Sequence, residues 1–119
     1  MSWDVEFTNE FGAWFRGLDD PTQRRIEAAV EKLQEIGPSL GRPFVDTLVG
    51  SRLPNLKELR PLGGSVRILF AFDPHRTAIL LLGGDTSGQW QSWYRNAIPA
   101  AERLYETYLE ELRQEGLLP

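Results

Sequence analysis

Polar and apolar side chains alternate along the first residues as they do on a half-buried strand. Trp3, Val5 and Phe7 are apolar, and the two residues between them are acidic. This period of two predicts an edge strand over about residues 2–7.

Two segments with apolar residues at helical spacing follow this strand. The first spans about residues 9–18, and the second begins at Asp20, which we expect to cap it because Pro21 suits the first position of a helix. Gly37 and Pro38 end the second segment, since glycine is favoured just after a helix and proline cannot continue one. The pattern therefore predicts an antiparallel helical hairpin.

Three further strands are predicted after a long loop over residues 39–55. The loop has no sustained period and contains turn-forming residues, namely Pro43, Gly50 and Pro54. The predicted strands cover residues 56–60, 66–72 and 78–82. In the first of them Lys57 faces one side of the sheet, whereas Glu58 and Arg60 face the other.

The C-terminal part is predicted to be helical. One or two helical turns cover residues 89–96 after a glycine-rich break, and the last helix begins near Pro99. The elements together predict an α+β fold with a small, mainly antiparallel four-stranded sheet, covered by the N-terminal helical hairpin, and with C-terminal helices. A chain of 119 residues is long enough for one domain with its own core, which we expect to span residues 1–119.

Composition excludes several kinds of chemistry. The chain has no cysteine and one histidine, so disulfides, thiolate sites and histidine-rich zinc sites are ruled out. The glycine-rich stretch 83–88 lacks the spacing and the lysine of a nucleotide-binding phosphate loop. No segment approaches the ~20 apolar residues of a membrane span, and the N-terminus lacks the features of a signal peptide. We therefore expect a soluble, cytoplasmic protein that uses neither a metal ion nor a cofactor.

The net charge of −4 disfavours a nucleic-acid partner, because phosphate binding relies on lysine and arginine. The distribution of charge changes this interpretation. Residues 42–76 hold six basic and three acidic residues, whereas residues 1–41 hold four basic and eight acidic ones. Positive charge is thus concentrated on the predicted loop and sheet. This distribution suits an anionic partner, or it reflects no more than the acidic solvent faces of the helices.

Arg67 stands in an apolar strand, where an unpaired guanidinium group would be costly. It therefore either forms a purely structural ion pair with Glu58 on the neighbouring strand or reaches an open cleft that receives an anion. Arg60 is its expected companion, because two guanidinium forks on one sheet face match the oxygens of a phosphate. This interpretation requires Arg60 and Arg67 to lie on the same face.

Aromatic residues follow the sheet at helical spacing. Trp90, Trp93 and Tyr94 lie along one side of a helical turn, so the simplest interpretation is that they are core residues, above all Trp90. Tyr94 lies beside Arg95 and close to a glycine-rich break, where its phenol could enter a cleft to exchange a proton or stack on a base. His75 occupies a predicted turn, where it is either solvated or takes part in catalysis.

Several motifs in the second half of the chain are fairly specific when they are taken together. These motifs are LKELR, VRILFAFDP, AILLLGGD and WYRNAIPAAERLYETYLEEL. With these motifs and this order of elements, the chain resembles the HigB-like branch of the RelE/ParE toxin superfamily, also described as phage-derived Gp49-like proteins. The resemblance covers nearly the whole chain.

The resemblance implies the toxin of a type II toxin–antitoxin system. Such a toxin is an mRNA interferase that cuts mRNA on the ribosome and is silenced by a helix-turn-helix antitoxin. The resemblance implies catalytic roles for Arg60, Arg67 and Tyr94 without a metal ion. The remaining candidates are the polar and aromatic residues expected around them to bind substrate: Lys57, Glu58, His75, Trp93 and Arg95.

Two alternatives within the superfamily stay open on the sequence. ParE-like toxins inhibit DNA gyrase by contact and cut nothing, and an inactive homologue would serve only as an antitoxin partner. Thr86 stands where relatives commonly have a lysine, and the acidic total charge is unusual for a protein that meets ribosomal RNA.

Overall fold

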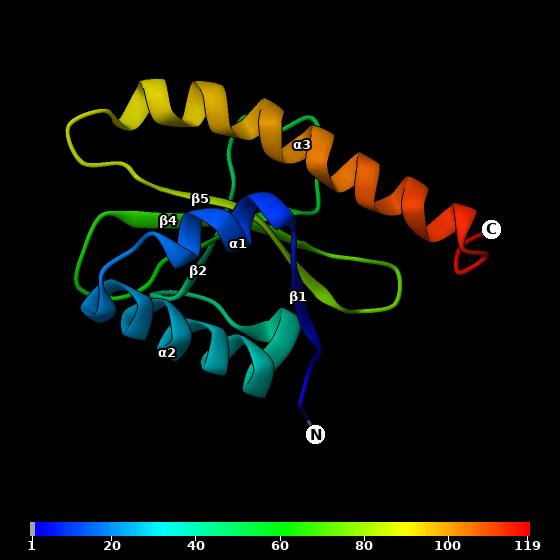
Figure 1. Ribbon diagram of the computed structural model, residues 1–119, viewed down its shortest axis with the longest axis horizontal. Helices are drawn as coiled ribbons and strands as arrows, with labels where there is room; N and C mark the ends of the chain where they lie inside the picture. The colour runs from blue at the N-terminus through cyan, green and yellow to red at the C-terminus, as the bar shows by residue number, and fades with distance from the viewer. Residues whose placement is uncertain (1) are drawn as a thin grey trace.

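A five-stranded sheet runs through the computed structural model, which describes residues 2–119 (Figure 1). The strands are β1 (Val5–Phe7), β2 (Val45–Thr47), β3 (Leu56–Leu59), β4 (Val66–Phe72) and β5 (Ala78–Asp85). Their order across the sheet is β1-β5-β4-β3-β2, and β1 pairs parallel to β5 whereas the other pairs are antiparallel. The α+β class and the mainly antiparallel sheet are confirmed, with five strands instead of four.

The additional strand, β2, lies within the segment predicted to be a loop. It pairs with β3 so that Asp46 lies opposite Glu58, and the N–H of Arg60 donates to the carbonyl of Phe44 at 2.7 Å. Three residues are too few to establish a period of two, so pattern alone could not reveal this strand. Its position at the edge of the sheet brings Asp46 next to the charged residues of β3.

The N-terminal helical hairpin is confirmed as α1 (Asn9–Arg16) and α2 (Asp20–Ile36). Thr8 caps α1, because its hydroxyl accepts a hydrogen bond from the N–H of Phe11 at 3.0 Å. The cap of α2 is Asp19, whose carboxylate accepts from the N–H of Thr22 at 3.0 Å. The expected cap at Asp20 was therefore wrong by one residue.

The sheet is buried on both faces, which gives the protein two cores (Figure 1). On one face, Ile68 and Phe70 of β4 pack against α1 and α2. On the other face, Leu69 and Ala71 of the same strand pack against the C-terminal helix. This alternation explains why β4 is apolar throughout and why Arg67, on the same face as Leu69, stands out.

The C-terminal helix α3 runs without interruption from Trp90 to Gln114. The predicted start at Pro99 was wrong. Proline inside a helix removes one hydrogen bond and costs about 3 kcal/mol. Here the loss is offset because Ala97, Ile98 and Ala101 around it are buried against the sheet. Within residues 2–119, neither α3 nor any other helix is both long and apolar enough to cross a membrane.

Candidate functional site

Two arginine side chains converge on the buried carboxylate of Glu58. Arg60 donates from Nε to Oε2 of Glu58 at 3.1 Å, and its Nη2 lies 3.0 Å from the same oxygen. Nε of Arg67 lies 3.8 Å from Oε1. Glu58 itself is only 3% exposed. Arg60 and Arg67 therefore lie on the same face of the sheet, the face that α3 covers.

Tyr94 completes this arrangement from the first turns of α3. Its phenol donates a hydrogen bond to Oε1 of Glu58. Burial, together with the hydrogen bond to Glu58, raises the pKa of Tyr94 to about 12, although the two nearby arginines oppose this shift. The phenol is therefore protonated at neutral pH and acts as a donor.

Trp90 covers Arg67 and does not belong to the core. The guanidinium carbon of Arg67 lies 5.1 Å from the centroid of the indole, and the indole stacks on Tyr94 with centroids 6.3 Å apart and planes 16° apart. Trp90 is 47% exposed. The interpretation of Trp90 as a core residue was wrong. Its spacing of four residues from Tyr94 was the signal that both share one helix face.

Asp46 is a further member that sequence reasoning missed. Its Oδ2 lies 3.5 Å from Nη2 of Arg60 and 3.1 Å from Nη2 of Arg42. The N–H of Thr47, assisted by the two arginines, lowers the pKa of Asp46 and keeps it charged. Because β2 was not predicted, no local pattern pointed to this residue.

One buried donor of Arg67 has no hydrogen bond among the described residues. Nη1 of Arg67 donates to the carbonyls of Val66 at 2.8 Å and Gly64 at 3.2 Å. Its buried Nε, by contrast, has no hydrogen-bond partner among the described residues. Nε of Arg67 and Oε1 of Glu58 form an ion pair at 3.8 Å, which is too long for a hydrogen bond. A buried donor without an acceptor is costly, so Arg67 is incompletely satisfied by the protein alone.

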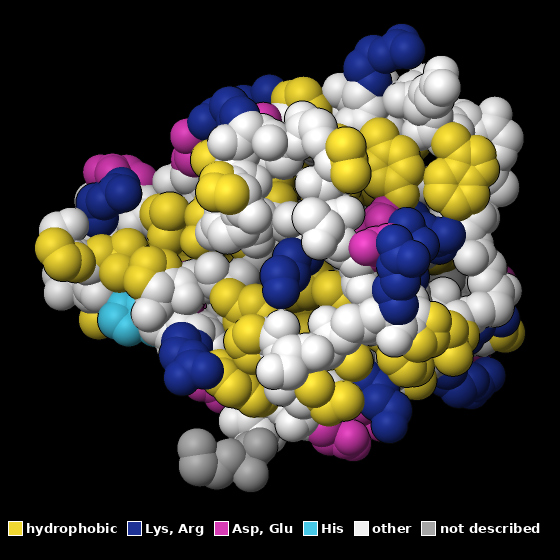
Figure 2. All heavy atoms as spheres, turned by 180° about the vertical axis from the view of Figure 1, so that it is seen from behind, with side chains coloured by type: hydrophobic (Ala, Val, Ile, Leu, Met, Phe, Trp, Pro, Cys, Tyr) yellow, Lys and Arg dark blue, Asp and Glu magenta, His cyan; other side chains and the backbone are white. Residues whose placement is uncertain are grey.

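We call these residues the Glu58 cluster. Its members are Asp46, Glu58, Arg60, Arg67, Trp90 and Tyr94. Figure 2 shows basic side chains gathered around an acidic one, next to large hydrophobic rings. The cluster combines two guanidinium groups, a neutral phenol and an aromatic surface on the α3 face of the sheet. Chemically it can hold an anion, move a proton through the phenol and carboxylate, and stack on a planar ring.

Lys57 and His75 do not reach this cluster. Lys57 lies on the opposite face of β3, where its ammonium donates to the carbonyl of Pro38 at 3.5 Å. His75 lies in the turn after β4, at the far end of the strand from Arg67, and its Nε2 is 2.7 Å from the carbonyl oxygen of Leu117. The expectation that both line the same cleft is corrected. For Lys57, the strand period already assigned the side chain to the other face.

Trp93 and Arg95 flank Tyr94 without joining the cluster. Trp93 packs over Gly84, where a Cβ would overlap the indole, and its ring meets Tyr94 edge-on with centroids 4.9 Å apart. This contact supports the orientation of Tyr94. Arg95 is exposed and lines a shallow groove of about 410 Å³ together with Tyr94 and Gly50.

Thr86 is a structural residue. It is fully buried, and both its N–H and its hydroxyl donate to the carbonyl of Ser65, at 3.0 Å and 2.8 Å. It thereby connects the end of β5 to the start of β4, close to Arg67. In the part of the chain that the structure describes, no three His, Cys, Asp or Glu side chains are grouped to hold a metal ion.

Comparison with solved structures shows that this is the fold of RelE toxins. The isolated E. coli RelE toxin matches with a TM-score of 0.61 and 12% identity, covering 82% of this chain and 96% of that chain. RelE in the archaeal RelE–RelB complex from Pyrococcus horikoshii OT3 matches with a TM-score of 0.59 and 17% identity, covering 74% of this chain and 99% of that chain. At such low identity the likeness establishes the fold alone.

Sequence relatives define the family more closely. Two Mycobacterium tuberculosis (strain ATCC 25618 / H37Rv) proteins are named as candidate toxins. One, HigB3, is 51% identical over 96 residues, which are 81% of this chain and 84% of that protein. The other, HigB2, is 48% identical over 111 residues, which are 91% of this chain but only 54% of that protein, so the chain spans about half of its length. The family model described as "Phage derived protein Gp49-like (DUF891)" matches residues 13–106. The chain belongs to this Gp49-like family, in the HigB-like branch of the RelE/ParE superfamily of type II toxins.

Proposed function

We propose that this protein is the toxin of a type II toxin–antitoxin pair and acts as a metal-independent endoribonuclease on mRNA bound to the ribosome. The observation that carries the proposal is the convergence of Arg60, Arg67 and the Tyr94 phenol on Glu58. A buried carboxylate with two guanidinium groups and a protonated phenol supplies both an anion site and a proton path. The RelE fold and the toxin names of the relatives support this assignment.

In the proposed reaction, the 2′-hydroxyl of one nucleotide attacks the adjacent phosphate. A bond forms between this oxygen and phosphorus, and the bond from phosphorus to the 5′ oxygen of the next nucleotide breaks. The products are a 2′,3′-cyclic phosphate and a free 5′-hydroxyl. The reaction needs a base for the 2′ proton and positive charge for the phosphate oxygens.

Tyr94 and Glu58 provide the proton path. The phenol takes the proton of the 2′-hydroxyl while it passes its own proton to Glu58, to which it is already hydrogen-bonded. Because the pKa of Tyr94 is raised to about 12, the phenol alone holds its proton at neutral pH, and the carboxylate behind it is needed as the acceptor. The departing 5′ oxygen takes a proton from solvent, and Glu58 later returns one to water.

Arg60 and Arg67 stabilise the charge that grows on the phosphate oxygens. The Arg60 side chain is 37% exposed and the Arg67 side chain 12%, so part of each guanidinium side chain is accessible to an incoming phosphate. Removing one preorganised donor of this kind typically costs about 100-fold to 1,000-fold in rate.

An antitoxin partner is part of the proposal. RelE-type chains of similar fold have been solved in complexes with RelB antitoxins, from Pyrococcus horikoshii and from E. coli. We propose a corresponding antitoxin for this chain. The resemblance of the sequence points to one of the helix-turn-helix class.

The test is cleavage of a defined mRNA in a purified translation system, followed by mapping of the fragment ends. Arg67→Ala and Tyr94→Phe should each lower the cleavage rate about 100-fold or more. Arg113→Ala is the matched control, because Arg113 is exposed and, within residues 2–119, pairs only with Glu110 on the same helix. Circular dichroism checks that each variant is folded.

Equal cleavage by the wild type and both variants would refute the roles of the two residues. Growth arrest with broken DNA and intact mRNA would refute the ribonuclease function and support a ParE-like inhibitor of gyrase. Normal growth and intact mRNA with the wild-type protein would indicate an inactive homologue.

A further inference from the structure

A row of alternating charges extends from the Glu58 cluster across the sheet. Its members, in order, are Arg67, Glu58, Arg60, Asp46 and Arg42, and the charged atoms of successive side chains lie 3.8, 3.0, 3.5 and 3.1 Å apart. We call this row the charge ladder. It holds three positive and two negative groups, so an excess of positive charge remains for an anionic ligand. The proposed cleavage uses Arg60 and Arg67 for the phosphate and does not involve Arg42.

Strand pairing places the ladder on one face of the sheet. Asp46 of β2 lies directly opposite Glu58 of β3, and Glu58 lies opposite Leu69 of β4. Directly opposite residues of paired strands point to the same side of a sheet, which here is the α3 face. Since neighbouring strands are ~4.8 Å apart, the distance from β4 to β2 is about 10 Å. The ladder therefore runs across the strands, from the middle of the sheet to its edge.

A turn holds Arg42 at the outer end of the ladder. The N–H groups of Phe44 and Val45 both donate to the carbonyl of Gly41, at 3.1 and 3.0 Å. This turn directs Arg42 back towards Asp46. The Arg42 side chain is 80% exposed and that of Asp46 is 20% exposed. An exposed ion pair contributes little to folding stability, so Arg42 can exchange this carboxylate for a phosphate at small cost.

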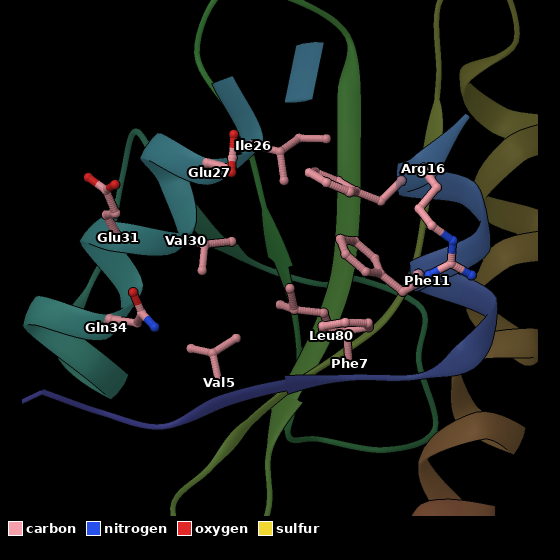
Figure 3. Close-up of a pocket in the computed structure, with 12 residues that line it drawn as sticks. Val5, Phe7, Phe11, Arg16, Ile26, Glu27, Val30, Glu31, Gln34 and Leu80 are labelled. Atoms are coloured by element: carbon pink, nitrogen blue, oxygen red, sulfur yellow. The ribbon is translucent and has the colours of Figure 1, made fainter. Parts of the chain in front are cut away.

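The groove between α1, α2 and β1 is a poor path for an RNA strand. It has a volume of about 440 Å³ and lies on the opposite face of the sheet from the Glu58 cluster. Glu27 and Glu31 border it on the α2 side and Arg16 on the α1 side (Figure 3). Two carboxylates against one guanidinium group disfavour the phosphates of RNA.

The groove of about 410 Å³ along α3 begins at Tyr94 but is also less suitable. It is lined by Arg52 and Arg95, and Arg52 already pairs with Glu102 and Glu106. The two positive charges are therefore balanced by two negative ones. The charge ladder, by contrast, keeps its positive excess and leads directly away from the proposed cleavage site.

We propose that Arg42 binds the backbone phosphate next to the one that is cleaved, and that Asp46 is a positioning residue that holds Arg42 beside Arg60. The RNA strand then crosses β4, β3 and β2, with the cleaved phosphate at Arg60 and Arg67. A guanidinium fork matches phosphate oxygens, and a row of such groups follows a single strand without reading its bases. This inference deepens the proposed function and rests on it, because it takes cleavage to occur at the Glu58 cluster.

The experiment compares two probes by NMR titration: a 5′-phosphorylated 2′-O-methyl trinucleotide, with three phosphates, and the matching mononucleotide, with one. The blocked 2′ oxygen cannot attack, so neither probe is cleaved. The wild type should bind the trinucleotide more tightly. Arg42→Ala should weaken the trinucleotide about fivefold and change the affinity for the mononucleotide less than about twofold. The slope of log affinity against log salt for the trinucleotide should become shallower by about 0.7, the contribution of one phosphate contact.

Arg113→Ala is the matched control for the loss of one charge. Arg113, like Arg42, is exposed and forms an ion pair with a carboxylate close by in the sequence. This variant should change the affinity for either probe less than about twofold. Equal effects of the two arginine variants on the trinucleotide, or equal weakening of both probes by Arg42→Ala, would overturn the proposal. A wild type that binds both probes equally would do the same.

Asp46→Asn tests the positioning residue. The variant is more positive, so it should bind the mononucleotide at least as tightly as the wild type does. The advantage of the trinucleotide over the mononucleotide should nevertheless shrink about threefold, because Arg42 is no longer held beside Arg60. An unchanged advantage would overturn the role of Asp46.

Cleavage kinetics in the purified translation system separate this proposal from the proposed function. Arg42→Ala should raise KM about fivefold with kcat unchanged, since Arg42 contacts no reacting atom, whereas Arg67→Ala should lower kcat. Binding of the trinucleotide through Arg42 with no cleavage by the wild type would refute the ribonuclease and leave Arg42 as an RNA-binding residue. Cleavage by the wild type, with KM and trinucleotide binding unchanged in Arg42→Ala, would refute the role of Arg42 alone.

Discussion

Replacing Glu58 with glutamine tests the charge on which the cluster depends. The side chain keeps its size, but two guanidinium groups and a phenol lose their common anionic acceptor. Removal of one member of a buried ion pair is destabilising because the partner stays behind in a poorly hydrated position. The expected result is a lower free energy of unfolding.

The magnitude follows from the surroundings of each partner. The Arg67 side chain is 12% exposed and loses its counter-charge with little water to replace it, which costs about 1.5 kcal/mol. The Arg60 side chain is 37% exposed, so solvent screens its loss to under about 1 kcal/mol. The Tyr94 phenol keeps a neutral acceptor and loses about 0.5 kcal/mol. The total is about 3 kcal/mol.

Urea unfolding followed by tryptophan fluorescence measures this loss. With a typical dependence of about 1–3 kcal/mol per M urea, the midpoint of Glu58→Gln should fall by about 1 to 3 M. The freed arginines should also bind an anion, so inorganic phosphate should raise the midpoint of Glu58→Gln more than that of the wild type. A loss below about 0.5 kcal/mol, or equal effects of phosphate on both proteins, would refute the role assigned to Glu58.

Further predictions concern the phenol, the aromatic cover and a buried carboxylate. The pKa of Tyr94 is about 12 in the folded protein and ordinarily near 10, so its protonated form contributes stability that is complete below pH ~10 and is lost as pH rises toward 12. The difference in urea midpoint between the wild type and Tyr94→Phe should therefore shrink over this range, and a constant difference would contradict the shift. Trp90→Ala should lower mRNA cleavage about tenfold, yet cost no more than about 1 kcal/mol in urea unfolding, because the indole is half-exposed over Arg67. Glu102→Gln should cost about 2 kcal/mol in the same measurement, since buried Glu102 accepts from the N–H of Arg52 at 2.7 Å and the hydroxyl of Ser51 at 2.8 Å. Glu106→Gln is its exposed control, and an equal loss in both variants would refute the role of burial.

The two faces of the sheet carry different surfaces. The Glu58 cluster lies on the α3 face, where charge and aromatic rings are combined. On the other face, α1 and α2 cover a hydrophobic core that Phe7, 60% exposed, continues at the surface. Strand β4, buried on both sides, separates them.

Features that depend on neighbours along the chain were predictable from the order of the amino acids. The apolar run over residues 66–72 reflects a strand buried on both sides, and the helical spacing in α1 and α2 reflects helices that bury one side, so the α+β class and the hairpin were predictable. The same local pattern singled out Arg67 as a charge in an apolar strand. The motifs around Arg60, Arg67 and Tyr94 likewise identified the toxin family.

Which of these residues are in contact depends on the tertiary structure. Glu58 lies at the centre of the cluster, and Asp46 on β2 lies opposite it. Strand pairing brings these residues together, although no local pattern in the sequence relates them. Helix α3 continued through Pro99 because burial against the sheet outweighs the lost hydrogen bond, and this continuity carries Trp90 over Arg67. Lys57 and His75 were separated from the cluster by the thickness of the sheet and the length of β4. Pairing and packing act between distant parts of the chain, so the composition of the site emerges only in the folded protein.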